Sequence, residues 1–154
     1  MKIHLLRHAK TAQFSSTGKD FDRKLADKGL RQCQKLKAYW ATFDFSNTLF
    51  LVSTAKRTQQ TFQESFSDLH ASSLDTLYLA SAQELLAVLN TQKTHKDIFI
   101  IGHNEGISEL ASYLSGQDIQ MKTAQYLCLE CDVPSSDFIS GNLGVICAKF
   151  RPEV

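Results

Sequence analysis

Short apolar runs alternate with longer amphipathic stretches along most of the chain. Four apolar runs have the length of a buried strand, and they span residues 2–8, 48–53, 73–79 and 97–103, the third being the weakest. The segments after them carry apolar residues at helical spacing. These segments predict four helices, the first over residues 23–43 and the others beginning near residues 55, 82 and 105. After residue 116 two further runs, 124–131 and 143–150, predict an antiparallel strand pair.

Capping residues agree with several of these boundaries. Ser81 and Glu84 form a capping-box pattern ahead of the third predicted helix. Ser53 or Thr54 is expected to cap the second helix and Asn104 the fourth. Gly116 is expected to end the fourth helix, because glycine readily adopts the left-handed conformation that often follows a helix.

Alternating strands and helices predict a three-layer α/β/α sandwich with a mostly parallel central sheet and a C-terminal antiparallel strand pair. The chain has 154 residues, of which 43% are hydrophobic, so we expect residues 1–154 to form a single domain with a full core. No apolar run is long enough to span a bilayer. The four cysteines, with no secretory signal at residues 1–10, favour reduced thiols and a cytoplasmic location.

The charge is unevenly distributed. Residues 1–40 carry ten Lys or Arg and three Asp, whereas the rest of the chain carries seven Lys or Arg and thirteen Asp or Glu. This imbalance favours an anionic ligand or an acidic partner near the basic N-terminal part. One face of the first predicted helix carries a basic stripe, formed by Lys24, Lys28, Arg31 and Lys35. The stripe fits either an ordinary solvated face or a docking surface for an acidic protein.

Polar residues follow three of the predicted strands. Arg7 and His8 end the first strand, Arg57 lies in the first turn of the helix after the second, and His103 and Asn104 end the fourth. Ligands of such sheets bind at the carboxyl ends of the strands. Two guanidinium groups, two imidazoles and helix N-termini are the groups that bind a phosphate, so we expect a phosphate site there.

The motifs at these positions resemble those of the histidine phosphatase superfamily, in the branch that includes phosphoglycerate mutase. "LLRHAKT" is similar to its Arg-His-Gly signature, "VSTAKRTQQT" to its Ser-x-x-x-Arg-x-x-Gln-Thr motif and "IIGHNEGISELASYL" to its second-His motif. "DFDRKLADKG" and "MKTAQYLCL" resemble segments of the small SixA-type phosphohistidine phosphatases. The chain departs from these patterns at three positions, which are Ala9, Lys24 and Glu105.

The resemblance implies a phosphoglycerate mutase-like fold and a phosphatase in which His8 becomes transiently phosphorylated. Arg7, Arg57 and His103 would be catalytic and would also bind the phosphoryl group, with Asn104 and Thr11 as further binding residues. No metal or cofactor is expected, because the arginines supply the positive charge. The general acid is not identified, and the candidates are Glu105, Asp22 and Asp20.

The absence of an evident general acid favours a weakly basic leaving group, such as the imidazole of phosphohistidine on a partner protein. No nucleic acid and no membrane is expected as a partner. Two alternatives stay open. The chain could be a small-molecule phosphomonoesterase or mutase of the same superfamily, or a phosphate-binding protein without catalysis.

Overall fold

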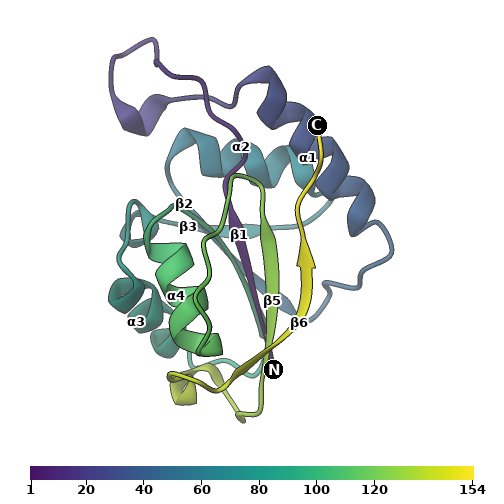
Figure 1. The fold of residues 1–154 in the computed structure, drawn as a ribbon, viewed down its shortest axis with the longest axis vertical. Helices are drawn as coiled ribbons and strands as arrows, with labels where there is room; N and C mark the ends of the chain where they lie inside the picture. The colour runs from purple at the N-terminus through teal and green to yellow at the C-terminus, as the bar shows by residue number, and fades with distance from the viewer.

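The structure, a computed structural model, describes residues 1–154. One six-stranded sheet crosses it in the order β3-β2-β4-β1-β5-β6 (Figure 1). The strands are β1 (Lys2–Arg7), β2 (Thr48–Ser53), β3 (Ala71–Leu74), β4 (Asp97–Gly102), β5 (Tyr126–Cys131) and β6 (Gly144–Phe150). β1 to β4 are mutually parallel, whereas β5 is antiparallel to β1 and β6 is antiparallel to β5. The predicted mostly parallel sheet with a terminal antiparallel pair is confirmed.

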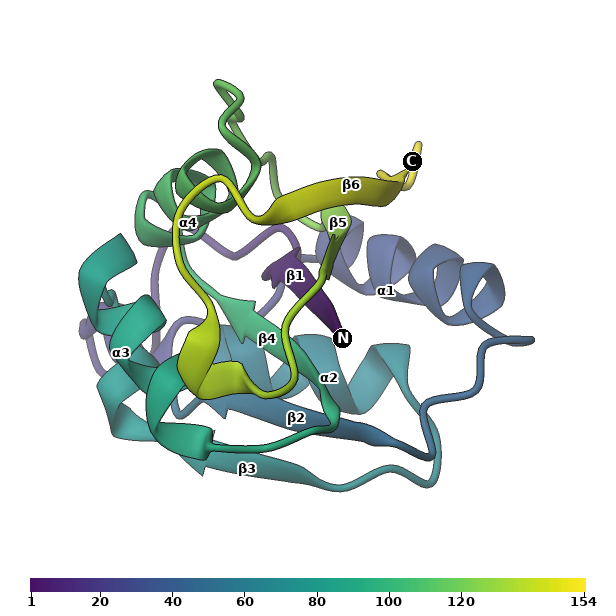
Figure 2. The same cartoon turned by 90° about the horizontal axis from the view of Figure 1, so that it is seen from below.

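Four helices cover the two faces of this sheet. They are α1 (Asp27–Tyr39), α2 (Lys56–Ser65), α3 (Ala82–Gln92) and α4 (Gly106–Ser115). Helices α1 and α2 pack together on one face, and α3 and α4 pack together on the other (Figures 1 and 2). The three-layer arrangement follows from the strand-helix alternation, as expected. None of the helices combines the length and the apolar character needed to cross a membrane.

The period-2 alternation along the central strands divides the core into two parts. In β1, Ile3 and Leu5 join the cluster under α3 and α4, whereas Leu6 joins the cluster under α1 and α2. In β4, Ile98 and Phe99 separate in the same way. Both faces of the central strands are therefore buried, which explains why these strands read as continuous apolar runs.

The first helix is shorter than the range 23–43 predicted for it. It starts at Asp27, because the preceding residues are extended and the Leu25 N–H donates to the side chain of Gln60. It ends before Trp40, whose ring N–H donates to the Ser65 carbonyl 2.8 Å away. Phe43, the last residue of the predicted helix, lies beyond α1 and is exposed.

The third strand was also placed wrongly. β3 ends at Leu74, and a 3-10 turn (Asp75–Leu77) occupies the middle of the predicted strand 73–79. The Thr54 hydroxyl donates to the Asp75 carboxylate, and Leu77 is buried in the core. These two interactions turn the chain away from the sheet.

Two of the expected caps are present. Ser81 and Glu84 form the reciprocal capping box, and Gly116 ends α4 with a positive φ of 70°. The other two expected caps are wrong. No side chain caps α2, whose N-cap position is Ala55, and α4 begins after Glu105 without a side-chain cap.

Candidate active site

The carboxyl ends of β1 and β4 bring the two histidines together. These strands are neighbours, and their register pairs Arg7 with Gly102, so that His8 and His103 leave the sheet side by side. Their ring centroids are 5.4 Å apart. Burial lowers the pKa of both rings, and the charges of Arg57 and Arg7 act on both rings in the same direction. The structure therefore brings together the four side chains that the sequence places at three strand exits.

His8 is held in one orientation by its own neighbours. Its ring is 8% exposed, and Nδ1 lies 2.8 Å from the Ala9 carbonyl oxygen. Because a carbonyl only accepts hydrogen bonds, Nδ1 carries the proton and Nε2 carries the free lone pair. Thr11 Oγ1 lies 3.3 Å from Nδ1. Burial lowers the pKa of His8 to about 4, with the positive charge of Arg57 adding to the effect and the bond to Ala9 opposing it. The ring is therefore neutral at pH 7.

His103 is fixed through its other nitrogen. Its Nε2 lies 2.8 Å from the Ser53 hydroxyl at the end of β2. Its Nδ1 is buried and has no hydrogen-bond partner in the chain. Burial lowers the pKa of His103 to about 3, and the charge of Arg57 contributes in the same direction. One ring nitrogen is thus anchored by Ser53, while the other is buried without a hydrogen bond in the chain.

The two guanidinium groups are held from different sides. Arg57 is 3% exposed, and its Nη1 and Nη2 donate to the main-chain carbonyl and the carboxylate of Asp20 at 2.9 and 3.0 Å. Arg7 Nη1 donates to the Met121 carbonyl at 3.0 Å, and its buried Nε has no partner in the chain. Burial and the nearby Arg151 lower the pKa of Arg7.

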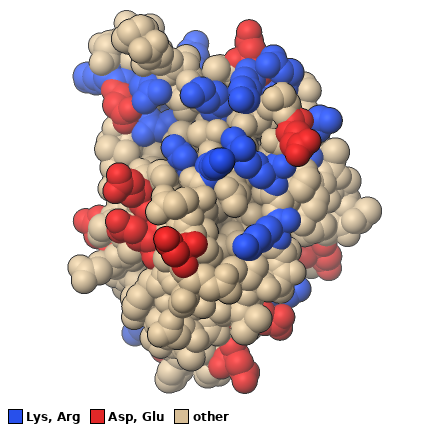
Figure 3. Space-filling model, viewed as in Figure 1, with Lys and Arg blue, Asp and Glu red and all other residues tan.

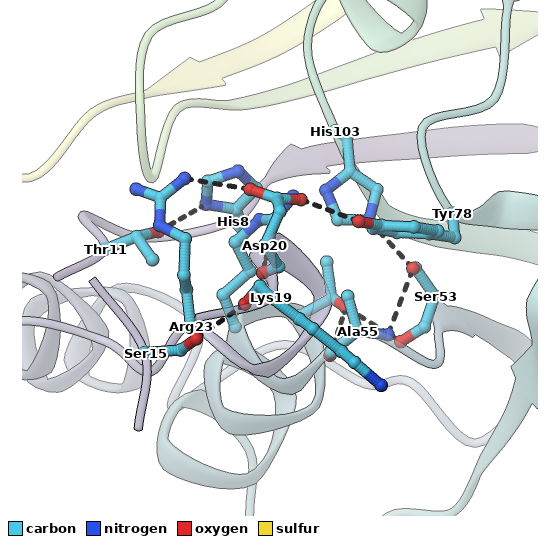
Figure 4. A network of polar contacts seen from close by, with 12 residues as sticks. His8, Thr11, Ser15, Lys19, Asp20, Arg23, Ser53, Ala55, Tyr78 and His103 are labelled. Atoms are coloured by element: carbon cyan, nitrogen blue, oxygen red, sulfur yellow. Dashed lines mark hydrogen bonds and ion pairs between the residues drawn. The ribbon is translucent and has the colours of Figure 1, made fainter. Parts of the chain in front are cut away.

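Asp20 connects the loop after β1 to this cluster (Figure 4). Its carboxylate also accepts hydrogen bonds from Tyr78 Oη at 2.7 Å and from Arg23 Nη1 at 3.0 Å. Partial burial favours the neutral acid, but the bonds from Tyr78, Arg23 and Arg57 outweigh it and hold the pKa of Asp20 far below its ordinary value. Asp20 is therefore an anion here and holds no proton to donate.

The other candidate acids and binding residues are placed as follows. Asp22 accepts the Thr17 hydroxyl at 2.5 Å, away from the histidines, and Glu105 is exposed. Asn104 Oδ1, just before α4, accepts the hydroxyl of Ser108 in the first turn of that helix. Binding of substrate by Asn104 therefore stays a prediction, whereas Thr11 does lie against His8.

Several residues of the Ser-x-x-x-Arg-x-x-Gln-Thr motif have structural roles that the sequence did not reveal. Ser53 orients His103. Gln60 Oε1 accepts the Leu25 N–H at 2.7 Å, and Thr61 Oγ1 accepts the Ala9 N–H at 3.0 Å. The motif thus ties α2 to the loop that carries the candidate nucleophile. Its fixed spacing, with Gln60 and Thr61 three and four residues after Arg57, is the signal that could have indicated this.

No three His, Cys, Asp or Glu side chains are grouped so that they could hold a metal ion. Cys128 and Cys131, which form a C-x-x-C pattern, are both buried in β5. A mechanism without metal stays a prediction.

Comparison with known proteins identifies relatives of the chain. The family model of the histidine phosphatase superfamily (branch 1) matches residues 3–77, which include Arg7, His8 and Arg57. An uncharacterized chloroplastic protein of Arabidopsis thaliana is 27% identical over 84% of this chain. The match covers 66% of that protein, so the chain spans slightly less than two thirds of the length of this relative.

Solved structures share the fold at low sequence identity. A protein from Agrobacterium tumefaciens, provisionally named phosphohistidine phosphatase SixA, has a TM-score of 0.82 and 23% identity, covering 98% of this chain and 97% of its own. The protein histidine phosphatase SixA in complex with tungstate has a TM-score of 0.80 and 17% identity, covering 98% of this chain and 97% of its own. At these identities the likeness establishes the fold. The resemblance to the histidine phosphatase superfamily (branch 1) rests on the family match over residues 3–77, slightly less than half of the chain.

Proposed function

We propose that this chain is a phosphatase in which Nε2 of His8 attacks phosphorus. The observation that carries the proposal is the orientation of His8. Its Nδ1–H is fixed on the Ala9 carbonyl, and its unprotonated Nε2 is held in a buried cluster with Arg7, Arg57 and His103. A nucleophilic imidazole must be neutral, and the low pKa of His8 keeps it so at physiological pH.

The reaction has two displacements at phosphorus. In the first, an N–P bond forms at His8 and the bond from phosphorus to the leaving group breaks. In the second, water attacks phosphorus, the N–P bond breaks, and inorganic phosphate leaves with His8 restored. The guanidinium groups of Arg7 and Arg57 balance the charge on the phosphoryl oxygens in both transition states.

A phosphohistidine on a partner protein is the substrate that these residues favour. An alcohol leaving group needs a proton, whereas the imidazole of phosphohistidine is a much weaker base and leaves with little assistance. Asp20 is ionised, and Glu105 and Asp22 bond to neither histidine. Between Arg57 and His103 the chain forms only the rest of α2, β3, the 3-10 turn Asp75–Leu77, α3 and β4, with short connections, so it has no inserted segment to enclose a small metabolite.

Trapping the covalent intermediate tests the reaction. We expect acid-labile, base-stable label on the protein when turnover of a labelled phosphoryl donor is quenched rapidly, and none with His8→Ala. Turnover of p-nitrophenyl phosphate should fall on the order of 10³-fold or more in that variant. Measurable phosphate binding with no turnover by either protein would instead identify a non-catalytic phosphate-binding protein.

Comparing substrates tests the finer proposal. A phosphohistidine peptide, p-nitrophenyl phosphate and a sugar phosphate should be turned over with falling kcat/KM in that order. A preference for the sugar phosphate would overturn the phosphohistidine proposal in favour of a small-molecule phosphomonoesterase or mutase. The cytoplasmic location, inferred from the cysteines, stays a prediction.

A further inference from the structure

A second basic pocket lies beside the candidate active site. It has a volume of about 270 Å³ and is lined by Lys28, Gln32 and the segment from Arg151 to Val154. None of these residues belongs to the cluster around His8, and the proposed reaction does not use them.

The sheet places Arg151 at the same edge as Arg7. β6 runs in the same direction as β1, because each is antiparallel to β5. Tyr126 pairs with Leu6 on one side and with Phe150 on the other, so Arg151 leaves β6 at the level where Arg7 ends β1. Two strand spacings separate these positions, which is about 10 Å.

Helix α1 brings the rest of the pocket to the chain just after His8. The Lys10 carbonyl accepts the Ala26 N–H at 2.9 Å and lies so near Gly29 that a Cβ there would be 2.1 Å from it. The Lys10 N–H donates to Gln32 Oε1 at 2.8 Å. Lys28 and Gln32 are four residues apart on α1 and therefore share a face. The pocket is thus built onto the backbone two residues beyond the candidate nucleophile.

Gln32 shows that the pocket is suited to a polar ligand. Its side chain is 1% exposed, so it is held in place by its surroundings. Its amide oxygen accepts the Lys10 N–H, whereas its amide nitrogen takes part in no hydrogen bond of the chain, and Gln32 is one of the residues that line the pocket. An N–H donor in a pocket that is also lined by Lys28 and Arg151 matches an anionic oxygen.

The surface around the pocket is rich in basic side chains. In Figure 3 Lys and Arg side chains gather on the upper half of the face, over the end of the sheet and over α1, whereas a group of acidic side chains lies over α4. Within the pocket, Glu153 offsets one of the two positive charges of Lys28 and Arg151. Lys28, Gln32 and Arg151 all carry N–H donors and line this one pocket, which suits the two oxygens of a carboxylate.

We propose that this pocket is an accessory anion site that receives an Asp or Glu side chain of the partner protein, close to its phosphohistidine. This inference rests on the proposed function and adds the chemistry by which the substrate is selected. The phosphoryl group would bind at Arg7 and Arg57, while the carboxylate binds at Lys28, Gln32 and Arg151.

Binding of matched peptides tests the site. Two fluorescein-labelled phosphohistidine peptides, identical except for Glu or Gln at the flanking positions, are titrated by anisotropy against the His8→Ala variant, which holds them without the proposed cleavage. We expect the acidic peptide to bind about fivefold tighter at moderate salt. Lys28→Glu or Arg151→Glu, added to this variant, should remove the difference. Equal binding of the two peptides to the parent variant would overturn the proposal.

Lys35→Glu is the matched control, because Lys35 is an exposed lysine on the same helix that does not line the pocket. It should keep most of the preference for the acidic peptide. If Lys35→Glu removed the preference for the acidic peptide as fully as Lys28→Glu, only diffuse charge would be involved and the proposal would be overturned. Tighter binding of a peptide with a second phosphate in place of the flanking Glu would overturn it as well.

The failure of this inference is distinguishable from the failure of the proposed function. Turnover of p-nitrophenyl phosphate and labelling of His8 involve only the cluster around His8, and Lys28→Glu should leave both within about twofold of the unsubstituted chain. If neither is detected but the acidic peptide still binds tighter in a Lys28-dependent way, the accessory site stands and the phosphatase proposal fails.

Discussion

The carboxylate of Asp20 lies 3.0 Å from Nη2 of Arg57, so one arm of a guanidinium proposed to bind phosphate is bonded to an internal anion. The main-chain carbonyl of Asp20 accepts Nη1 of the same side chain at 2.9 Å. Tyr78 and Arg23 hold the carboxylate in this position. A phosphoryl group that binds Arg57 therefore meets a negative charge already present in the site.

Removing this charge should strengthen binding of phosphate analogues. In Asp20→Asn the bond from Arg57 to the main-chain carbonyl remains, while the repulsion of a phosphate disappears. Because the carboxylate is partly exposed, we expect the inhibition constant of vanadate or inorganic phosphate to fall by only about two- to fivefold.

Asp22→Asn is the control for this variant. It removes the same charge from the same loop, but Asp22 bonds to Thr17 and not to Arg57. Equal effects of the two substitutions would show that only the overall charge of the loop matters.

The alternation of apolar runs was sufficient to predict the layers, the parallel strands and the terminal pair, because burial on both faces of β1 and β4 leaves a continuous apolar signal. It failed where a tertiary contact ends an element. The bond from Trp40 to Ser65 and the bond from Thr54 to Asp75 each join residues at least 21 positions apart. No local pattern records such contacts.

The site was predictable to the extent that strand ends define it. Parallel strands must bring Arg7, His8 and His103 to one edge once their order is known. The partners that orient these groups could not be predicted. Ser53 belongs to the Ser-x-x-x-Arg-x-x-Gln-Thr motif, but the motif does not tell which group its hydroxyl bonds, and Tyr78 fell in a segment predicted as a strand. Likewise, the pocket around Gln32 depends on the return of β6 to the edge where β1 ends.

Ser53 is expected to act by positioning His103. Ser53→Ala removes the hydroxyl 2.8 Å from Nε2, so the ring is free to reorient. We expect kcat to fall about tenfold with little change in KM, because the loss affects alignment in the transition state.

A double-mutant cycle checks this role. If Ser53 acts through His103, adding Ser53→Ala to His103→Ala should cost almost nothing further in kcat. Ser73→Ala, which removes a hydroxyl bonded to the side chain of Gln59, should leave kcat unchanged. Additive losses in the cycle would instead assign Ser53 a purely structural role.

The close approach of α1 to the loop after His8 requires a glycine at position 29. A Cβ at that position would lie 2.1 Å from the Lys10 carbonyl oxygen, so Gly29→Ala forces the helix and the loop apart. We expect a loss of about 1–3 kcal/mol in the free energy of unfolding, measured by urea denaturation, together with reduced turnover.

Gly18→Ala provides the contrast for that measurement. No atom lies within 4 Å of a Cβ at this position, but its φ is +77°. The cost should be confined to the backbone conformation and come to about 1 kcal/mol. A larger loss for Gly18→Ala than for Gly29→Ala would contradict the proposed packing.

Three buried histidines should make the fold sensitive to mild acid. The pKa is lowered from 6.5 to about 4 for His4 and His8 and to about 3 for His103, in each case mainly by burial. Between pH 6.5 and about 4 the unfolded chain therefore binds protons that the folded chain does not, and folding stability falls as the pH falls. At pH 5 each histidine should cost about 1–2 kcal/mol, whereas above pH 7 none of them contributes.

Urea unfolding at pH 7.5, 6.5, 5.5 and 5.0 measures this dependence, and His4→Phe isolates one part of it. His4 lies outside the candidate active site, bonded to Tyr126 and stacked on Phe99. Its replacement loses the bond to Tyr126 at every pH. The slope of the free energy of unfolding against pH, between pH 6.5 and 5, should fall by about a third, because one of three buried imidazoles is gone. Exposed His70 is the control, and His70→Gln should leave the slope as it is. An unchanged slope in His4→Phe would mean that groups other than the buried imidazoles cause the sensitivity to acid.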